Sequence, residues 1–157
     1  MNEERNKGTI CAPCDGEVIK LEDVSDEVFS SGVMGDGFAI LPESKRINSP
    51  VTGKIENAYK TGHAYTISSE DGLDILVHIG IDTVELDGKF FEKKAGIGEQ
   101  IKKGEPLAVA DIGKILDAGF DPVIVVVIST PEKMHNVEIN YGKCYSGDDV
   151  MKYVISN

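Results

Sequence analysis

Two of the three histidines in this chain, His63 and His78, lie on either side of the short polar segment "SSEDG" (residues 68–72). The residues on both sides of the segment alternate between apolar and polar types, which is typical of β-strands with one buried face. Ser, Asp and Gly are common turn residues. We therefore expect a β-hairpin that carries one histidine on each strand.

The length of the turn decides how the two histidines are paired. A loop of two or four residues pairs His63 directly with His78, with Cβ atoms about 5 Å apart. If Asp71 and Gly72 form the centre of a type I′ turn, His78 instead faces Tyr65, and the two histidines are diagonal neighbours. Both registers bring the imidazoles within reach of each other.

Two neighbouring imidazoles have three chemical uses. They can bind a metal, share a proton, or act as a nucleophile and its supporting group. A neutral imidazole accepts a phosphoryl group near pH 7 because its ring nitrogen has a free lone pair. A second N–H nearby can hydrogen-bond the phosphoryl oxygens during transfer. The alternative is that the two histidines are unrelated polar residues at the ends of a sheet.

The three cysteines could be redox-active or chemically inert. Cys11 and Cys14 form a Cys-x-x-Cys motif, and the third cysteine is Cys144. A redox-active motif of this kind lies at the start of a helix, where the helix dipole lowers the pKa of the first thiol. Here the motif is followed by "DGEVIKLEDV", which alternates like a strand. We therefore interpret all three as reduced thiols without a redox function.

Short alternating segments separated by Gly, Pro, Asp and Ser dominate the chain. Such spacing indicates an all-β protein, an antiparallel β-sandwich or barrel-sandwich hybrid with minor short helices. Residues 111–122 predict a helix with an Asp111 cap and Gly119 as its stop. Residues 147–154 fit either a helix or a strand.

The sequence also contains an internal duplication. Residues 10–19 ("ICAPCDGEVI") and 47–56 ("INSPVTGKIE") align with matching Ile, Pro and Gly positions. A repeat of this kind suggests duplicated β-units around one core. The first copy has ten extra residues, most simply within 21–33, and this added loop is a candidate functional surface. We expect a flexible leader at 1–7 and a single domain at 8–157.

Composition excludes several classes of function. The chain has 27 acidic and 16 basic residues and a net charge of −11, which argues against nucleic-acid binding and favours basic protein partners. The longest apolar run, 123–128, is too short to span a membrane. The charged N-terminus lacks the apolar stretch of a secretory signal. We therefore expect a cytoplasmic protein without stable membrane insertion, and a monomer.

The segments "VHIGIDTVELDG" (77–88), "GHAYTI" (62–67), "GDGFAI" (35–40) and "KKGEPL" (102–107) together resemble one known family. This is the glucose-family enzyme IIA, the type-1 EIIA domain of the bacterial phosphoenolpyruvate:sugar phosphotransferase system. The resemblance covers residues 8 to 157. The pattern His-[Ile/Phe]-Gly-Ile-Asp-Thr-Val-x-Leu is specific, whereas Gly-Asp-Gly alone would be weak.

The resemblance implies a role for each site residue. His78 would carry the phosphoryl group on Nε2, and His63 would stabilise that group. Thr61 matches a threonine whose hydroxyl orients an imidazole ring. Asp26 and Asp82 match carboxylates that engage an arginine of the partner protein. The family also surrounds its histidines with an apolar ring for partner docking, which here corresponds to Val28, Phe29, Met34, Tyr59, Leu76 and Val84.

The resemblance also implies the partners. The phosphocarrier protein HPr would donate the phosphoryl group, and a cysteine on the IIB domain of a sugar transporter would accept it. Regulatory protein targets are compatible with the same surface. No cofactor is expected to be required, although Zn²⁺ at His63 and His78, bound adventitiously or with a partner's help, is chemically reasonable. Glu27 and Thr66 depart from the apolar residues more common in the family, and His135 matches no family site.

Two other functions fit parts of the sequence. A zinc hydrolase could use His63, His78 and Asp82 as ligands, but the His-x-His pair of the related peptidases is missing. A lipoyl-like or biotinyl-like carrier is suggested by "IKKGEPL", but such a carrier needs a modified lysine at the tip of a tight hairpin, and no such tip is evident.

Overall fold

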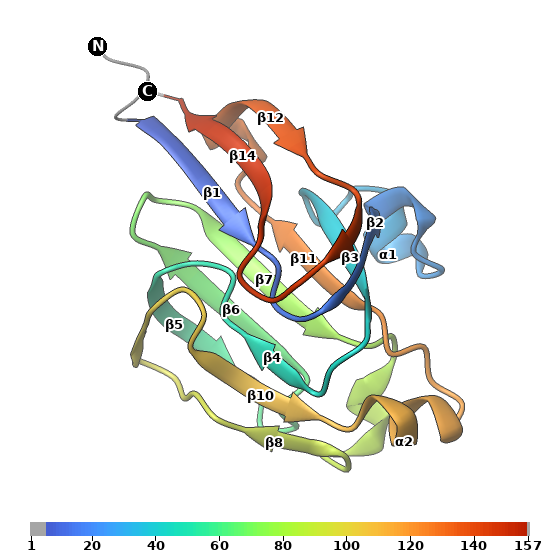
Figure 1. Ribbon diagram of the computed structural model, residues 1–157. Coiled ribbons are helices and arrows are strands. Elements are labelled where there is room, and N and C mark those ends of the chain that lie inside the picture. The colour runs from blue at the N-terminus through green and yellow to red at the C-terminus, as the bar shows by residue number, and fades with distance from the viewer. Residues whose placement is uncertain (1–5, 157) are drawn as a thin grey trace.

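Antiparallel strands make up nearly all of the regular structure in the computed structural model, which describes residues 6–156 (Figure 1). The strands form a β-sandwich of one eight-stranded sheet and two three-stranded sheets. Their bounds are β1 Lys7–Cys11, β2 Gly16–Lys20, β3 Asp36–Pro42, β4 Arg46–Asn48, β5 Gly53–Ala58, β6 Ala64–Ser69, β7 Asp74–Ile79, β8 Phe91–Lys93, β9 Gln100–Ile101, β10 Pro106–Ala110, β11 Ile124–Ile128, β12 Met134–Ile139, β13 Gly142–Cys144 and β14 Asp149–Ile155. The expected all-β fold is confirmed.

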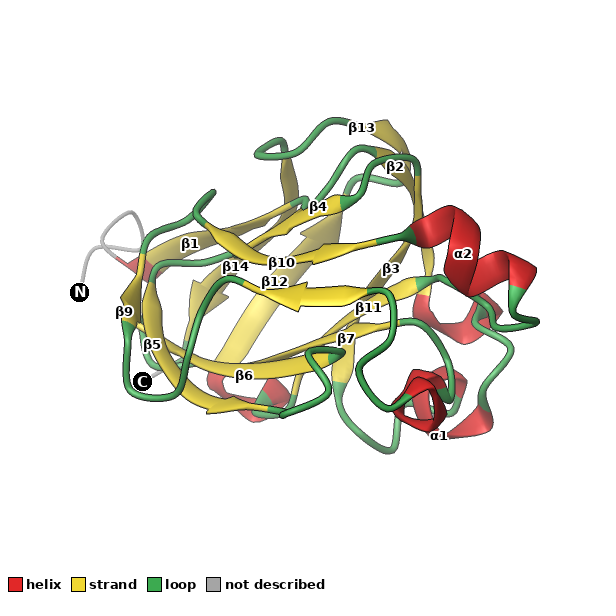
Figure 2. Cartoon of the chain, turned by 90° about the horizontal axis from the view of Figure 1, so that it is seen from below, coloured by secondary structure: helices red, strands yellow, loops and turns green. Residues whose placement is uncertain are grey.

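The two helices are short. Helix α1 spans Glu27–Ser30 and α2 spans Ile112–Asp117. Both lie at the same end of the molecule (Figure 2). The predicted helix in 111–122 is α2, and its cap is as expected, because the Asp111 side chain accepts a hydrogen bond from the Lys114 amide. Among the described residues, no helix has the length and apolar character needed to cross a bilayer.

The central sheet has the strand order β13-β2-β3-β11-β7-β6-β5-β9. Strand β11, "IVVVI", is buried along its whole length because apolar layers cover both of its faces. Ile124, Val126 and Ile128 face the main core, whereas Val125 and Val127 face a smaller cluster on the other side. A continuous apolar run is what burial on both faces requires.

The duplication is visible in the backbone. Gly16 starts β2 and Gly53 starts β5. A Cβ atom at either position would clash with a carbonyl oxygen of the neighbouring strand, that of Leu41 for Gly16 and that of Ser68 for Gly53. Both copies therefore need glycine for the same reason, the close approach of two backbones.

The two copies also pair with each other in a reciprocal way. The Cys11 amide donates to the Pro50 carbonyl at 3.0 Å, and the Asn48 amide donates to the Pro13 carbonyl at 2.8 Å. In the alignment of the two copies, Cys11 corresponds to Asn48 and Pro13 corresponds to Pro50. Each copy therefore donates and accepts the same bond. This exchange is what two related units facing each other around a shared core would form.

The added residues of the first copy lie where the alignment expects them. Residues 21–35 connect β2 to β3, whereas residues 59–63 connect β5 to β6. The longer connection contains α1, and it is held on the sheet by Val24 and Phe29, which pack in the smaller apolar cluster with Val125. The smaller apolar cluster thus anchors the inserted loop to the sheet.

The register of the β6–β7 hairpin corrects the sequence analysis. His78 pairs with Ala64, and neither with His63 nor with Tyr65. The reason is a three-residue loop, 70–72: the Gly72 amide donates to the Ser69 carbonyl at 3.0 Å, and Gly72 has a φ of 95°. A three-residue loop is a common hairpin connection. It places Ala64 opposite His78, one residue away from each of the two pairings predicted from the sequence.

Two further expectations can be compared with the structure. Residues 147–154, left open between helix and strand, contain most of β14, the central strand of the β1-β14-β12 sheet. The leader expected at 1–7 falls mainly on residues 1–5, which lie outside the described residues, and Lys7 already belongs to β1.

Candidate functional site

His78 lies near the end of β7, beside Val125 of β11. Its Nδ1 atom lies 2.7 Å from the carbonyl oxygen of Gly80. A carbonyl oxygen can only accept a hydrogen bond, so Nδ1 carries the proton and donates it. The lone pair of the neutral ring is therefore on Nε2.

His63 comes directly before β6, and its side chain is only 3% exposed. Its Nδ1 atom is hydrogen-bonded to the Thr61 hydroxyl. The two imidazole centroids are 5.0 Å apart, with the ring planes at 83° to each other. The expected convergence of the histidines is therefore present, although the register differs. Because His63 precedes β6, the alternation of side chains along the strand does not set its direction. The Ile79 amide donates a hydrogen bond to the His63 carbonyl at 2.7 Å, and this bond holds His63 beside the end of β7.

Aromatic rings cover both imidazoles. The centroid of Phe29 is 5.1 Å from that of His78, and the centroid of Tyr59 is 5.3 Å from that of His63. Phe29 comes from the inserted loop and Tyr59 from the shorter connection between β5 and β6. The corresponding connections of the two duplicated units thus contribute one aromatic side chain each.

Burial controls the protonation of the pair. It lowers the pKa of His63 to about 4, with a further contribution from His78. Burial also lowers the pKa of His78, while the hydrogen bond to Gly80 and the charges of Asp26 and Asp82 oppose this shift. Both rings are therefore neutral at pH 7 and have free lone pairs.

The two aspartates lie beside His78 on different segments. Asp26 is the N-cap of α1, and its Oδ1 atom accepts a hydrogen bond from the Val28 amide at 2.8 Å. Asp82 is exposed and has a left-handed backbone conformation with a φ of 59°. Both carboxylates act on the pKa of His78, so both lie close enough to interact with a charged group on it.

The expected apolar ring is mixed in exposure. Four members, Val28, Met34, Tyr59 and Val84, are exposed. Leu76 is half-buried. Phe29 is only 6% exposed, so most of its side chain packs inside the inserted loop and against His78. The accessible part of the ring therefore consists of the other five side chains.

The Cys-x-x-Cys motif has no features of a redox site. Cys11 and Cys14 are fully buried. Burial raises the pKa of Cys11 to about 11 and that of Cys14 to about 12. Thiols that remain protonated and inaccessible do not act as nucleophiles. The interpretation as structural cysteines agrees with this geometry.

The arrangement of possible metal ligands bears on the zinc-hydrolase alternative. Within residues 6–156, no group of three or more His, Cys, Asp and Glu side chains is arranged to hold a metal ion. The three-ligand set of His63, His78 and Asp82 that a zinc hydrolase would need is therefore not formed. Nε2 of His78 has a free lone pair because Nδ1 carries the proton, whereas Nε2 of His63 can act as a ligand only in the tautomer with the proton on Nδ1.

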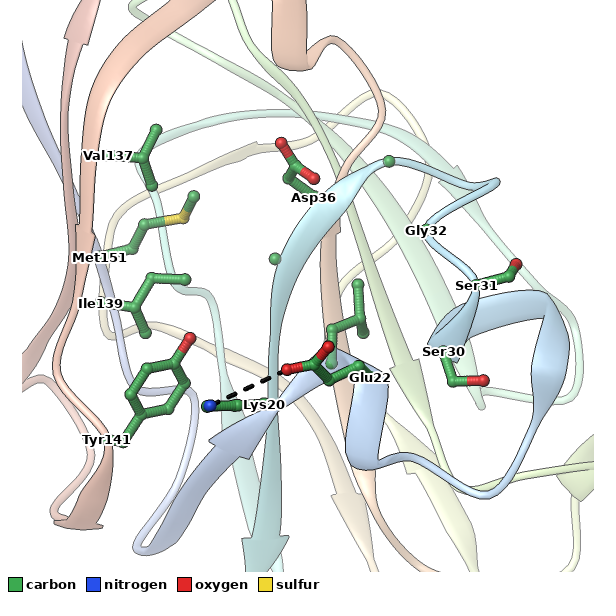
Figure 3. A pocket seen from close by; sticks show the side chains of 13 residues that line it. Lys20, Glu22, Ser30, Ser31, Gly32, Asp36, Val137, Ile139, Tyr141 and Met151 are labelled. Carbon is green, nitrogen blue, oxygen red and sulfur yellow. Dashed lines mark ion pairs between the residues drawn. The ribbon is translucent and has the colours of Figure 1, made fainter.

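A separate cleft adjoins the inserted loop (Figure 3). One wall is formed by loop residues such as Ser30 and Ser31, and the other by apolar residues that include Ile139 and Met151. The ion pair between Lys20 and Glu22 in this cleft is exposed, with a separation of 3.9 Å. Neither site histidine lines this cleft, so it is distinct from the histidine site.

One site residue was missed by the sequence analysis. The carbonyl of Gly80 fixes the tautomer of His78, and the glycine has a φ of 80° at the turn after β7. A Cβ atom here would clash with the Thr83 side chain. The signal was the glycine two residues after the histidine in "HIG", which marks a turn directly after the strand.

Comparisons with known proteins show the family to which the chain belongs. The family model for the phosphoenolpyruvate-dependent sugar phosphotransferase system, EIIA 1, matches residues 8–134. The glucose-specific EIIA component of Buchnera aphidicola is 39% identical over 145 residues, which cover 92% of this chain and 90% of that protein. The beta-glucoside-specific EIIBCA component of Bacillus subtilis is 42% identical over 130 residues, 83% of this chain but only 21% of that longer protein.

A solved structure agrees with the fold. The glucose permease IIA of Mycoplasma capricolum has a TM-score of 0.89 and 33% identity to this chain, and the match covers 97% of this chain and 99% of the other. The chain therefore belongs to the EIIA 1 family of the sugar phosphotransferase system, whose members are phosphoryl carriers in sugar uptake.

Proposed function

We propose that His78 accepts a phosphoryl group on Nε2 from the phosphocarrier protein HPr and passes it to a cysteine on the IIB domain of a sugar transporter. The single observation that carries this proposal is the hydrogen bond from His78 Nδ1 to the Gly80 carbonyl. It fixes the tautomer, so that the free lone pair is on Nε2. The neighbouring imidazole of His63 lies 5.0 Å from the His78 ring, measured between centroids.

The transfer needs no general base. The Nε2 lone pair forms a new N–P bond while the N–P bond of the donor breaks, and the donor imidazole recovers its electron pair. The neutral state of His78 at pH 7 makes this lone pair available. In the second step, the cysteine sulfur of IIB forms an S–P bond and the His78 N–P bond breaks.

His63 and Thr61 have a supporting role in this proposal. The Thr61 hydroxyl is hydrogen-bonded to Nδ1 of His63. We assign the hydroxyl as the donor, which directs the imidazole proton to Nε2. A neutral Nε2–H then donates a hydrogen bond to a phosphoryl oxygen. Because the low pKa of His63 keeps the ring neutral, it can stabilise the phosphoryl group without trapping it as a strong ion pair.

Asp26 and Asp82 face the partner in this proposal. Each would bind an arginine of the partner protein, which offsets the charge of the phosphoryl group during transfer. The exposed side chains of Val28, Met34 and Val84 would exclude water from the docked surfaces. HPr and IIB act in the cytoplasm in this scheme.

A zinc site is a secondary proposal at the same position. The Nε2 atoms of His63 and His78 could supply two ligands if the proton of His63 moves to Nδ1 and the Thr61 hydroxyl accepts it, and zinc prefers four. The remaining ligands would have to come from a partner or from water. No step of the phosphoryl transfer uses this metal, so a chelator should leave phosphoryl acceptance intact.

Labelling from phosphoenolpyruvate with Enzyme I and HPr tests the proposed function. We expect an acid-labile label on the wild-type protein and none on His78→Gln. His63→Gln should still accept the label but should pass it on to IIB much more slowly. Labelled His78→Gln together with unlabelled His63→Gln would reverse the two roles, and loss of labelling with a chelator would favour a metal-dependent mechanism.

A further inference from the structure

A buried hydroxyl closes the turn that follows β7. Thr83 is the first residue of a short 3₁₀ helix, Thr83–Leu86, and its exposed fraction is 0%. The Thr83 hydroxyl donates a hydrogen bond to the carbonyl of Ile79 at 2.5 Å. Ile79 is the last residue of β7 and comes directly after His78. The bond therefore ties the strand that carries the proposed nucleophile to the element that follows the turn.

The peptide group that joins Ile79 to Gly80 is held on both sides. Its carbonyl accepts the hydrogen bond from Thr83, and its N–H donates to the Val123 carbonyl at 2.7 Å. The Thr83 methyl group also fills the space beside Gly80, because a Cβ atom on Gly80 would clash with it. Thr83 thus contacts both this peptide group and the glycine that follows it.

The next peptide group contains the carbonyl that orients His78. Its carbonyl, that of Gly80, accepts the Nδ1 proton of His78 at 2.7 Å, and its N–H, that of Ile81, donates to the Asp121 carbonyl at 2.9 Å. Gly80 joins this peptide group to the one that Thr83 holds. A rotation of the first group therefore displaces the carbonyl of the second.

The turn also contains a residue with an unfavourable backbone conformation. Asp82 is left-handed, with a φ of 59° and a ψ of 16°, which is costly for a residue other than glycine. Among the residues that the structure describes, Thr83 and His78 are the only two whose side chains are hydrogen-bonded to the backbone of residues 79–82. The Thr83 bond is therefore the one side-chain hydrogen bond, apart from that of the nucleophile itself, that holds this turn.

We propose that Thr83 is a positioning residue for phosphoryl transfer, because its hydroxyl keeps the Gly80 carbonyl against Nδ1 of His78. The inference rests on the proposed function, in which Nε2 of His78 is the nucleophile. A methyl group in place of the hydroxyl cannot approach the carbonyl oxygen to 2.5 Å, since C···O contacts are about 3.3 Å or longer. The carbonyl of Ile79 would turn away and the Gly80 carbonyl would move with it. The proton of the neutral His78 ring would then no longer be confined to Nδ1.

Imidazole ¹⁵N chemical shifts of the unphosphorylated protein test this assignment, together with the rate of labelling at saturating phospho-HPr. In the wild type, the neutral His78 ring should be protonated on Nδ1 alone. Thr83→Val keeps the shape of the side chain and should show both neutral tautomers of His78, with labelling slower by about three- to tenfold. Thr83→Ala removes the hydroxyl without placing a methyl group near the carbonyl and should show the same two changes, so the test does not depend on the folding of the valine variant.

Two further variants are the controls. Thr83→Ser keeps the hydroxyl and loses the methyl group, so it should retain the single tautomer and be labelled within about twofold of the wild-type rate. Ser49→Ala removes another fully buried hydroxyl, which donates to the Val51 carbonyl at 2.6 Å. Ser49 directly follows β4, which belongs to a different sheet from β7, so this variant should change neither the tautomer nor the rate.

A single His78 tautomer or an unchanged labelling rate in Thr83→Val and Thr83→Ala would overturn the assignment. An equal change in Thr83→Ser would overturn it as well, because the methyl packing would then be the cause, and an equal change in Ser49→Ala would trace the effect to a general loss of stability. The tautomer is measured without a partner protein, so it tests Thr83 separately from the proposed function. A wild type that shows the single tautomer but accepts no label would instead overturn the proposed function.

Discussion

The two imidazoles of the site differ in what their Nδ1 atoms contact. A carbonyl oxygen, that of Gly80, holds the proton on Nδ1 of His78, whereas a hydroxyl, that of Thr61, can donate to Nδ1 of His63. With the Thr61 hydroxyl as the donor, as we propose, the same residue type presents a lone pair at one position and an N–H at the other. This difference is the physical basis for assigning a nucleophile and a stabilising group.

Thr61→Val tests how the hydroxyl orients His63. Removal of the hydrogen bond should allow both neutral tautomers of His63, and onward transfer to IIB should fall about tenfold, equivalent to about 1.4 kcal/mol. Imidazole ¹⁵N chemical shifts report the tautomer directly. Thr61→Ser is the control, because it keeps the hydroxyl and should retain both the single tautomer and most of the transfer rate. A Val variant with an unchanged ¹⁵N spectrum would contradict this role.

At the scale of single residues, the sequence predicted the types that meet at the site but not their individual contacts. The proximity of His63 and His78 follows from any short hairpin between them. The Gly80 contact and the burial of Phe29 depend on how a turn and an inserted loop pack against the sheet. Such tertiary contacts are not encoded in local spacing.

At the scale of elements, the β6–β7 hairpin shows the limit of register prediction. Adding or removing one loop residue moves the pairing by one position, and a polar turn such as "SSEDG" accommodates loops of two, three or four residues. The structure has three, with Gly72 in the left-handed region. The strand β14 was similarly ambiguous, because its pattern is compatible with a helix until its two neighbours, β1 and β12, are known.

Two glycine substitutions distinguish a glycine required by its backbone conformation from a glycine required by the close approach of two strands. Gly72→Ala adds a Cβ in open space but at a φ of 95°, so it should lower the free energy of unfolding by about 1 to 2 kcal/mol. Gly53→Ala places a Cβ against the Ser68 carbonyl of β6 and should cost at least about 3 kcal/mol. Urea unfolding of both variants measures the difference, and equal costs would contradict the described β5–β6 approach.

At the scale of the whole molecule, the duplicated units are what could be predicted best. The repeat at 10–19 and 47–56 located both glycine-led strands and the insertion that carries α1. The reciprocal hydrogen bonds between the copies and the division into three sheets could not be predicted, because they join residues distant in sequence. Overall acidity favours basic protein partners but predicts no particular contact surface.

The stability of the molecule should depend on pH through His63. Its pKa is lowered from 6.5 to about 4 in the folded state, so the unfolded chain binds more protons between these values. The stabilisation is fully present above pH 6.5 and is lost as the pH falls toward 4. From pH 7 to pH 5, His63 should reduce the free energy of unfolding by about 2 kcal/mol, and His78 acts in the same direction.

Urea unfolding of the wild type and of His63→Gln across this range measures the effect. The variant lacks the titrating group, so its loss of stability between pH 7 and pH 5 should be smaller by about 2 kcal/mol. His135→Gln is the control, because His135 is an exposed histidine on β12. Identical pH profiles for His63→Gln and wild type would contradict a buried, neutral His63.

The atom that carries phosphorus is the most direct test of the whole account. The protein should be phosphorylated from phosphoenolpyruvate, and long-range ¹H–¹⁵N and ³¹P NMR spectra should be recorded before the label hydrolyses. We predict phosphorus bonded to Nε2 of His78, with Nδ1 of the same ring still protonated. Phosphorus on Nδ1 of His78, or on either nitrogen of His63, would contradict the mechanism derived from the Gly80 hydrogen bond.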